Sequence, residues 1–221
     1  MELNEEGEPS GLLPSQRYYR MCKEVEKMSQ TKTSVSVNEF RWYKLYLPIP
    51  MGCSIITTVN EKGQVNAAPF AMVFPWNNDE KEPQLIVMAF SGWHTSQNIK
   101  NTEEFVVNWP ETHLIDKIMK TAVLHDEGVN ELEQAGLTEM PAVKVKPPRI
   151  AECVGHYECK LNRIIEMGAG YHIIGDVVDI SINEEYAAMS RDERTQKIKL
   201  PIAFGAPVGQ YLGCSRRGEK V

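Results

Sequence analysis

The chain has 221 residues, of which 42% are hydrophobic and 24% are charged, a balance typical of one globular domain with a substantial core. Its formal net charge of −6, without any block of Lys or Arg, argues against a nucleic-acid-binding surface. No apolar run is long enough to span a bilayer, and the acidic N-terminus is unlike a secretory signal or a transit peptide. We therefore expect a cytoplasmic protein with neither a membrane nor a nucleic-acid partner.

The first 40 residues differ in pattern from the rest. Residues 1–15 are rich in Gly, Pro, Ser and Glu, and residues 16–30 place apolar side chains at helical spacing. The sequence thus predicts an N-terminal tail and helical arm over 1–40 and a main domain over 41–215. We expect the arm to pack against a partner subunit.

The main domain begins with β patterns. Segments 54–60 and 64–73 are separated by a turn that contains Gly63, an arrangement that suits a hairpin. Residues 84–90 form a nearly continuous apolar run, which is typical of a strand buried on both faces. Three strands are therefore predicted before residue 91.

The next part mixes helices with a strand. A short polar helix is expected over 95–101, followed by a strand over 104–109. Residues 112–123 carry apolar side chains on one side, as an amphipathic helix does, and a second short helix around 130–135 ends at Gly136.

The last predicted elements are the strands 150–167 and 170–183, which form a long hairpin. Short strands without regularly alternating long helices favour an antiparallel barrel with helices at its ends over a Rossmann sheet. The G-x-G-x-x-G dinucleotide fingerprint does not follow any of these strands. The predicted class is mainly β with peripheral helices.

Two local patterns suit a flavin. The small residues Ala67 and Ala68, beside Asn66 and Pro69, let a flat ligand approach the backbone closely. The polar turn over 91–96 opens a helix, where hydroxyls and free backbone N–H groups suit a phosphate. A planar slot followed by a phosphate cradle predicts a site for flavin mononucleotide (FMN).

The order of these motifs resembles the FMN-binding split-barrel flavin reductases, most closely the flavoredoxin-like branch. The resemblance covers about residues 42–212 and rests on SIITTVNEKGQVNAAPF, SGWHTSQNIKNTEEFVVNWP, AGL at 135–137, PPR at 147–149 and IGDVV at 174–178. It implies an antiparallel Greek-key split β-barrel that binds FMN and forms a homodimer, with the flavin near the dimer interface. It also implies NAD(P)H as electron donor and a small-molecule flavin and nicotinamide as partners.

Within this resemblance, the segment from Asn66 to Phe70 is the candidate contact for the edge of the isoalloxazine ring. Its members are Asn66, Ala67, Ala68, Pro69 and Phe70, and the alternative is an ordinary strand that ends in small residues. Thr57 and Thr58 lie on the facing strand. Because side chains alternate along a strand, one of the two should point toward the ligand and the other into the barrel interior.

The candidate phosphate and ribityl group comprises Ser91, His94, Thr95 and Asn98. Relatives often place Lys or Arg where this chain has His94, and a neutral imidazole brings no charge. The alternative for Ser91 or Thr95 is a simple helix cap. Trp93 either covers the flavin or fills the barrel mouth.

His172 is the candidate catalytic residue, because relatives often carry a His two residues earlier, near the nicotinamide. The alternative is a surface or packing histidine. The five cysteines form no C-x-x-C pair, so buried or partly exposed free thiols are expected rather than a disulfide framework, and no metal site is expected.

The sequence leaves two functions open. One is an oxidoreductase that transfers hydride from NAD(P)H to flavin. The other is a flavoredoxin-like electron carrier that keeps FMN tightly bound and exchanges electrons with protein partners. A flavin-binding or storage protein without turnover is a weaker third reading.

Overall fold

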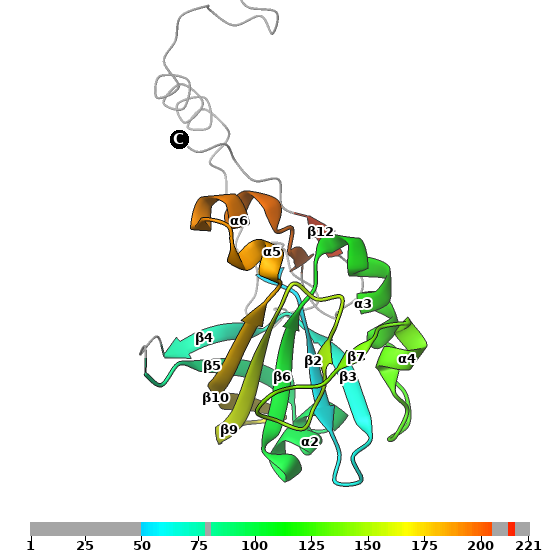
Figure 1. The fold of residues 1–221 in the computed structure, drawn as a ribbon. Helices are drawn as coiled ribbons and strands as arrows, with labels where there is room; N and C mark the ends of the chain where they lie inside the picture. Colours follow the sequence, from blue (N-terminus) through cyan, green and yellow to red (C-terminus); the bar gives the residue numbers. More distant parts are fainter. Residues whose placement is uncertain (1–49, 78–80, 205–211, 215–221) are drawn as a thin grey trace, which may run out of the picture. The chain divides into compact units, whose positions relative to one another are not determined.

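The computed structural model describes residues 50–77, 81–204 and 212–214, so the helical arm predicted within 1–40 lies outside the described residues. Its main feature is a seven-stranded antiparallel sheet in the order β3-β2-β6-β9-β10-β5-β4 (Figure 1). The strands are β2 (Ser54–Val59), β3 (Val65–Phe70), β4 (Val73–Asn77), β5 (Gln84–Phe90), β6 (Glu104–Trp109), β9 (Gly155–Met167) and β10 (Gly170–Ile182).

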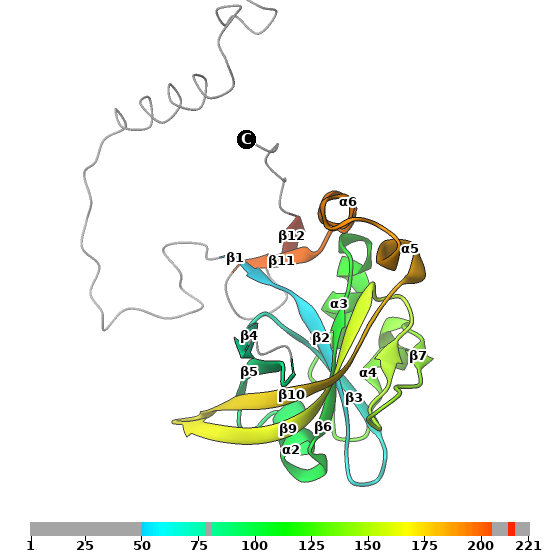
Figure 2. The same ribbon diagram turned by 60° about the vertical axis from the view of Figure 1, so that its left-hand side comes forward.

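Smaller elements surround this sheet. A three-stranded sheet contains β1 (Pro50–Gly52), β11 (Pro201–Phe204) and β12 (Leu212–Cys214), and β7 (Glu139–Met140) pairs with β8 (Arg149–Ile150). The helical elements are α2 (His94–Thr102), the 3-10 turn η3 (Thr112–Leu114), α3 (Ile115–Thr121), α4 (Glu131–Ala135), α5 (Glu184–Ala187) and α6 (Arg191–Lys197). Helix α2 lies at one end of the sheet, and α3, α5 and α6 lie at the other (Figures 1 and 2).

The edges of the large sheet are β3 and β4, which are consecutive in the chain. Only Ala71 and Met72 lie between them, so the sheet must curl until its two edges come close together. The edges do not pair, and the barrel is therefore split. The prediction of one strand over 64–73 is wrong, because the chain crosses from one edge to the other at this point.

Both strand prolines of the large sheet fit this arrangement. Pro69 lies in β3 and Pro75 lies in β4, so both occupy edge strands. Proline has no N–H to donate to a neighbouring strand and is tolerated at a sheet edge. The expected antiparallel split barrel, mainly β with peripheral helices, is confirmed.

The core is divided between two sides of the β2–β3 hairpin. Ile56 belongs to the cluster inside the barrel, which includes Phe105 and Ile173. Its neighbour Ile55 belongs to a second cluster beneath α3 and α4, with Ile118 as one member. Both faces of β2 are thus buried, which explains why its sequence does not alternate between apolar and polar residues.

One close approach inside the barrel requires glycine. A Cβ atom at Gly175 would lie 2.5 Å from Cζ of Phe105, whose side chain is fully buried. The pairing of β10 with β9 shifts register between Ile174 and Gly175. The Phe105 ring thus occupies the space that any larger residue at this position would need.

We expect Gly175→Ala to lower the free energy of unfolding by about 1–3 kcal/mol, the usual cost of overpacking a core. Phe105→Leu in the same chain should recover part of this loss by giving the new methyl group room. Gly92→Ala is the control, since no atom lies within 4 Å of its Cβ position. Urea unfolding measures all three variants, and a stable Gly175→Ala protein would contradict the packing argument.

Candidate functional site

A buried polar cluster lies where β2, β3 and α2 meet. Nδ2 of Asn66 donates to Oγ1 of Thr95 at 3.1 Å and to Oγ1 of Thr58 at 3.4 Å. Nδ2 of Asn98 also donates to Oγ1 of Thr58, at 3.0 Å. All four side chains are buried. The structure therefore brings together four residues that the sequence predicted as parts of a flavin site.

The two threonine hydroxyls of this cluster keep hydrogens that no described residue accepts. The oxygens of Thr58 and Thr95 accept hydrogen bonds from amides, and neither hydroxyl donates to a described residue. A hydroxyl group has one donor besides its acceptor lone pairs. Both threonines thus retain a hydroxyl donor within the cluster.

The start of α2 adds backbone donors. Trp93 precedes the helix and makes no side-chain capping bond, and the amides of His94, Thr95 and Ser96 have no acceptor among the described residues. Neither Ser91 nor Thr95 therefore caps the helix, contrary to the capping alternative. Free amides at the start of a nine-residue helix fit a phosphate group, and the half-buried His94 is the first residue of that helix.

Ser91 is tied to the β9–β10 turn. Its amide and its hydroxyl both donate to the carbonyl oxygen of Ala169, at 2.9 and 3.1 Å. In this arrangement its hydroxyl hydrogen is used within the protein. The structure thus places Ser91 beside the helix start without freeing its hydroxyl for a ligand.

Trp93 packs against two aromatic rings, one from β3 and one from β5. Its ring meets Phe70, at the end of β3, with centroids 5.8 Å apart, and Phe90, at the end of β5, with centroids 5.0 Å apart. Both contacts are edge-to-face, a favourable geometry for aromatic rings. Trp93 is thus held by two aromatic rings while 38% of its surface stays exposed.

Thr57 and Thr58 point to opposite sides of β2. The Thr57 hydroxyl donates to the carbonyl oxygen of Pro148 and accepts from Nδ2 of Asn108 at 3.1 Å. Thr58 is therefore the residue that faces the cluster. The prediction that the other threonine faces the barrel interior is wrong, because Thr57 faces the segment that precedes β9.

The backbone of the candidate ring-edge segment is largely engaged. The amide of Ala67 donates to Oε2 of Glu131 at 2.8 Å. Because N–H directions alternate along a strand, the amides of Asn66, Ala68 and Phe70 point toward β2, and Pro69 has none. The groups left facing outward at Ala67 and Pro69 are carbonyl oxygens, which accept hydrogen bonds but do not donate them.

The side chains of this segment face two environments. Ala67 packs in the cluster beneath α3 and α4, whereas Phe70 and the half-buried Ala68 pack against the cluster inside the barrel. Ala68 is therefore partly a core residue. Glu131 was missed by sequence reasoning, since it lies in a short helix without any site motif.

His172 lies apart from this cluster. Its neighbours Tyr171 and Ile173 belong to the barrel core, so the His172 side chain points to the outer face of β10. It lies opposite Met88 of β5 and Ile165 of β9. The structure does not bring it to the Thr58 side of the barrel, and this position favours the packing alternative.

The thiols offer no reactive group in the described core. Cys53, Cys153 and Cys159 are free and buried, and burial raises the pKa of Cys53 to about 12. A buried thiol that resists ionisation is a poor nucleophile.

In the part of the chain that the structure describes, no cluster of His, Cys, Asp and Glu is suited to hold a metal ion. None of its helices has both the length and the apolar character needed to cross a membrane.

Comparison with known proteins defines the class. The family model described as "Flavin reductase like domain" matches residues 46–198, so the chain belongs to the flavin reductase-like domain family, and membership implies flavin binding. An uncharacterized protein of Methanothermobacter thermautotrophicus is 38% identical over 142 residues, which span 62% of this chain and 66% of that protein.

Two solved structures share the fold. Nitrilotriacetate monooxygenase component B from Bacillus cereus superposes with a TM-score of 0.77 at 23% identity, over 87% of this chain and 100% of that one. Flavoredoxin of Desulfovibrio vulgaris superposes with a TM-score of 0.69 at 18% identity, over 86% of this chain and 97% of that one. At these identities the likeness concerns the fold.

We expect Thr95→Ala to weaken FMN binding by about 1–2 kcal/mol, the scale of one hydrogen bond to a charged group. The control is Thr102→Ala in the same helix, where the hydroxyl bonds to the carbonyl oxygen of Asn98 at 2.9 Å, at the far end from the free amides. Fluorescence titration with FMN measures both variants. Equal affinities in the two variants would move the phosphate site away from the start of α2.

Proposed function

We propose that this protein is an FMN-containing oxidoreductase of the flavin reductase type, which accepts hydride from NAD(P)H. The observation that carries the proposal is the buried cluster of Thr58, Asn66, Thr95 and Asn98 beside the free amides of α2. It lies in a chain whose family implies flavin binding. No carboxylate pair or nucleophile is required, because hydride transfer depends mainly on how the two rings are positioned.

The residues of the site fit FMN. The amides of His94, Thr95 and Ser96, with the Thr95 hydroxyl, would hold the phosphate, and Thr58 would reach the ribityl chain. When bound, the flavin supplies a hydride acceptor. The absence of the G-x-G-x-x-G motif from the sequence supports FMN over a dinucleotide flavin.

An electron carrier is the second candidate. The superposition with flavoredoxin supports it at the level of the fold. The two functions differ in the source of electrons: a carrier takes them from a reduced protein, whereas a reductase takes them directly from a nicotinamide. The residues of the cluster would hold FMN in either case.

Anaerobic reduction distinguishes the two candidates. We expect the purified protein to contain or to bind FMN, identified by chromatography of the released flavin, and NADH or NADPH to bleach its visible absorbance within seconds. Reduction only by a reduced iron–sulfur protein would support the carrier. A protein that binds FAD but not FMN would overturn the cofactor assignment.

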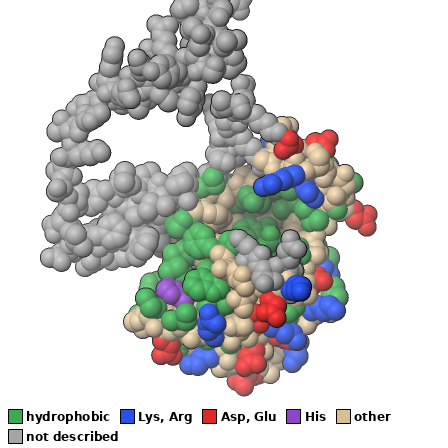
Figure 3. Space-filling view, turned by 90° about the vertical axis from the view of Figure 1, so that its left-hand side faces the viewer, with side chains coloured by type: hydrophobic (Ala, Val, Ile, Leu, Met, Phe, Trp, Pro, Cys, Tyr) green, Lys and Arg blue, Asp and Glu red, His purple; other side chains and the backbone are tan. Residues whose placement is uncertain are grey.

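We also propose a homodimer that covers one outer face of the barrel. This apolar face consists of Phe74, Phe90, Ile165 and Met167, which are 43%, 57%, 37% and 57% exposed. The register of β4, β5, β10 and β9 places all four on the side away from the barrel interior. Apolar side chains gather on this side of the molecule (Figure 3). A second copy of the chain would remove them from water.

Ile165→Glu should convert the dimer into a monomer, because it places a charge within the apolar face. Ile180→Glu is the matched control, since Ile180 lies on the same hairpin, is 60% exposed and is not part of that face. Sedimentation velocity at micromolar concentration measures both. A monomeric wild-type protein, or a dimer that survives Ile165→Glu, would refute this interface.

A further inference from the structure

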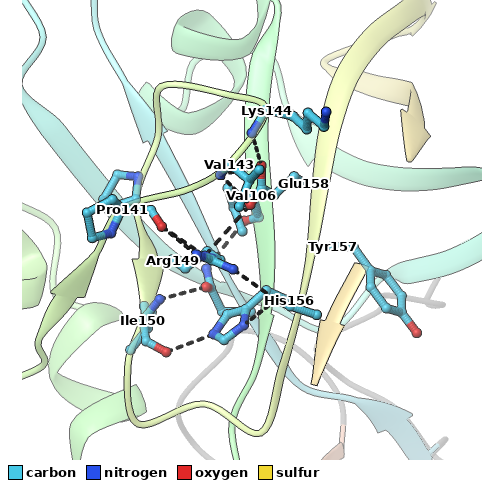
Figure 4. Close-up of polar contacts among 12 residues, drawn as sticks. Val106, Pro141, Val143, Lys144, Arg149, Ile150, His156, Tyr157 and Glu158 are labelled. Carbon is cyan, nitrogen blue, oxygen red and sulfur yellow. Dashed lines mark hydrogen bonds and ion pairs between the residues drawn. The ribbon is translucent and has the colours of Figure 1, made fainter. Parts of the chain in front are cut away.

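Buried charges fasten the connector, residues 138–150, onto the outer face of β9 (Figure 4). The Glu158 side chain is fully buried. Its carboxylate accepts from the amide of Val143 at 2.9 and 3.0 Å and from the amide of Lys144 at 2.6 Å. A buried carboxylate is stable only when such donors compensate its lost hydration.

Arg149 holds the connector from its other end. Its Nε and Nη2 donate to the carbonyl oxygen of Pro141 at 3.0 and 2.6 Å, and Nε lies 3.7 Å from Oε1 of Glu158. Its Nη1 donates to Oγ of Ser181 on β10 at 3.2 Å. The guanidinium thus joins the connector to two strands of the barrel.

His156 completes the cluster, and its neighbours determine its tautomer. Nε2 lies 2.8 Å from the carbonyl oxygen of Ile150, which only accepts, so Nε2 carries a hydrogen. In the neutral ring Nδ1 carries no hydrogen, so it accepts from the Ser181 hydroxyl, whose oxygen lies 3.1 Å away. In this tautomer, hydrogen bonds run in one direction from Arg149 through Ser181 and His156 to Ile150.

We propose that this cluster is a proton-operated latch, in which uptake of one proton by His156 releases the connector from the barrel. A proton on Nδ1 turns this nitrogen into a donor, so the Ser181 hydroxyl can no longer donate to it. It also places an imidazolium and the Arg149 guanidinium around one hydroxyl oxygen. Moving Arg149 away with the connector separates the two cations, and opening the site hydrates the imidazolium.

The charges around His156 favour the neutral ring in the closed state. Burial lowers the pKa of His156, the Ile150 carbonyl raises it, Arg149 lowers it and Glu158 raises it, with a net decrease from 6.5. The other groups turned toward it are the uncharged Asn108 from β6 and Ser181 from β10. Further charges near the cluster are Lys144 and Glu139 on the connector and Asp179 on β10.

Because the pKa of His156 is lower in the closed state, the closed state binds the proton less tightly than the open state does. In the open state the imidazole is hydrated and takes up a proton near its ordinary pKa of 6.5. The closed state is therefore favoured above that pH and loses its advantage as the pH falls below it. One proton changes the opening equilibrium by up to about tenfold for each pH unit.

Amide hydrogen exchange of the full-length protein tests the latch. After correction for intrinsic exchange rates, the amides of Val143, Lys144 and Ile150 should lose fivefold or more protection between pH 7.5 and pH 5.0, whereas the β2–β3 hairpin should not. In His156→Gln the side-chain amide still offers a donor and an acceptor but does not titrate. This variant should show equal connector protection at both pH values.

His113→Gln is the matched control, because His113 is exposed and lies outside the cluster. It should keep the wild-type pH dependence. Equal protection in the wild type at both pH values, or a pH dependence that survives His156→Gln, would overturn the latch. Should His156→Gln fail to fold, the wild-type protein decides: the His156 Cε1 proton resonance must titrate over the pH range in which the connector opens.

Discussion

The side-chain amide of Asn108 is the contact on which the arrangement of the site depends. Its Nδ2 donates to the carbonyl oxygen of Ile55 at 3.0 Å and to Oγ1 of Thr57 at 3.1 Å, while its Oδ1 accepts from the amide of Ile150 at 2.9 Å. The residue is fully buried, so each unmade bond would be costly. Asn108 holds Thr57 toward the connector, and alternation then turns Thr58 toward α2. Of the two threonines, Thr58 is therefore the one that bonds to Asn98 of α2.

The sequence correctly predicted those helices and strands that depend on residues close together in the chain. The strand over 104–109 and the helix that ends at Gly136, which has φ of 65°, follow from apolar runs and from a residue suited to left-handed backbone. The pairing of Pro50 with Phe204 joins distant parts of the chain, and no nearby residue signals it. Strand β4 was missed because the apolar run continues through Ala71 and Met72, where the chain changes sheet edge.

In the candidate site, the residue types could be chosen from the sequence, whereas the positions of their side chains depend on the fold. Sequence reasoning chose Thr58, Asn66, Thr95 and Asn98 for their chemistry, and the fold brings them together. It also chose Ser91, whose hydroxyl is used by the β9–β10 turn, because strand pairing of that hairpin decides where the turn lies. Side chains alternate along a strand, so Thr57 and Thr58 point to opposite sides. Alternation alone does not say which of them points toward α2, because that depends on how β2 pairs with its neighbours.

Trp93 joins the candidate flavin site to the apolar face. It stands directly before the free amides of α2 and contacts Phe90, which is 57% exposed on that face. A partner subunit that covers Phe90 would also restrict Trp93 and the start of the helix. The conformational entropy of these groups would then be lost on dimerisation and not on flavin binding. The dimer would therefore bind a flavin more tightly than the monomer. Because linkage is reciprocal, a flavin that orders the start of α2 would favour the dimer by the same factor.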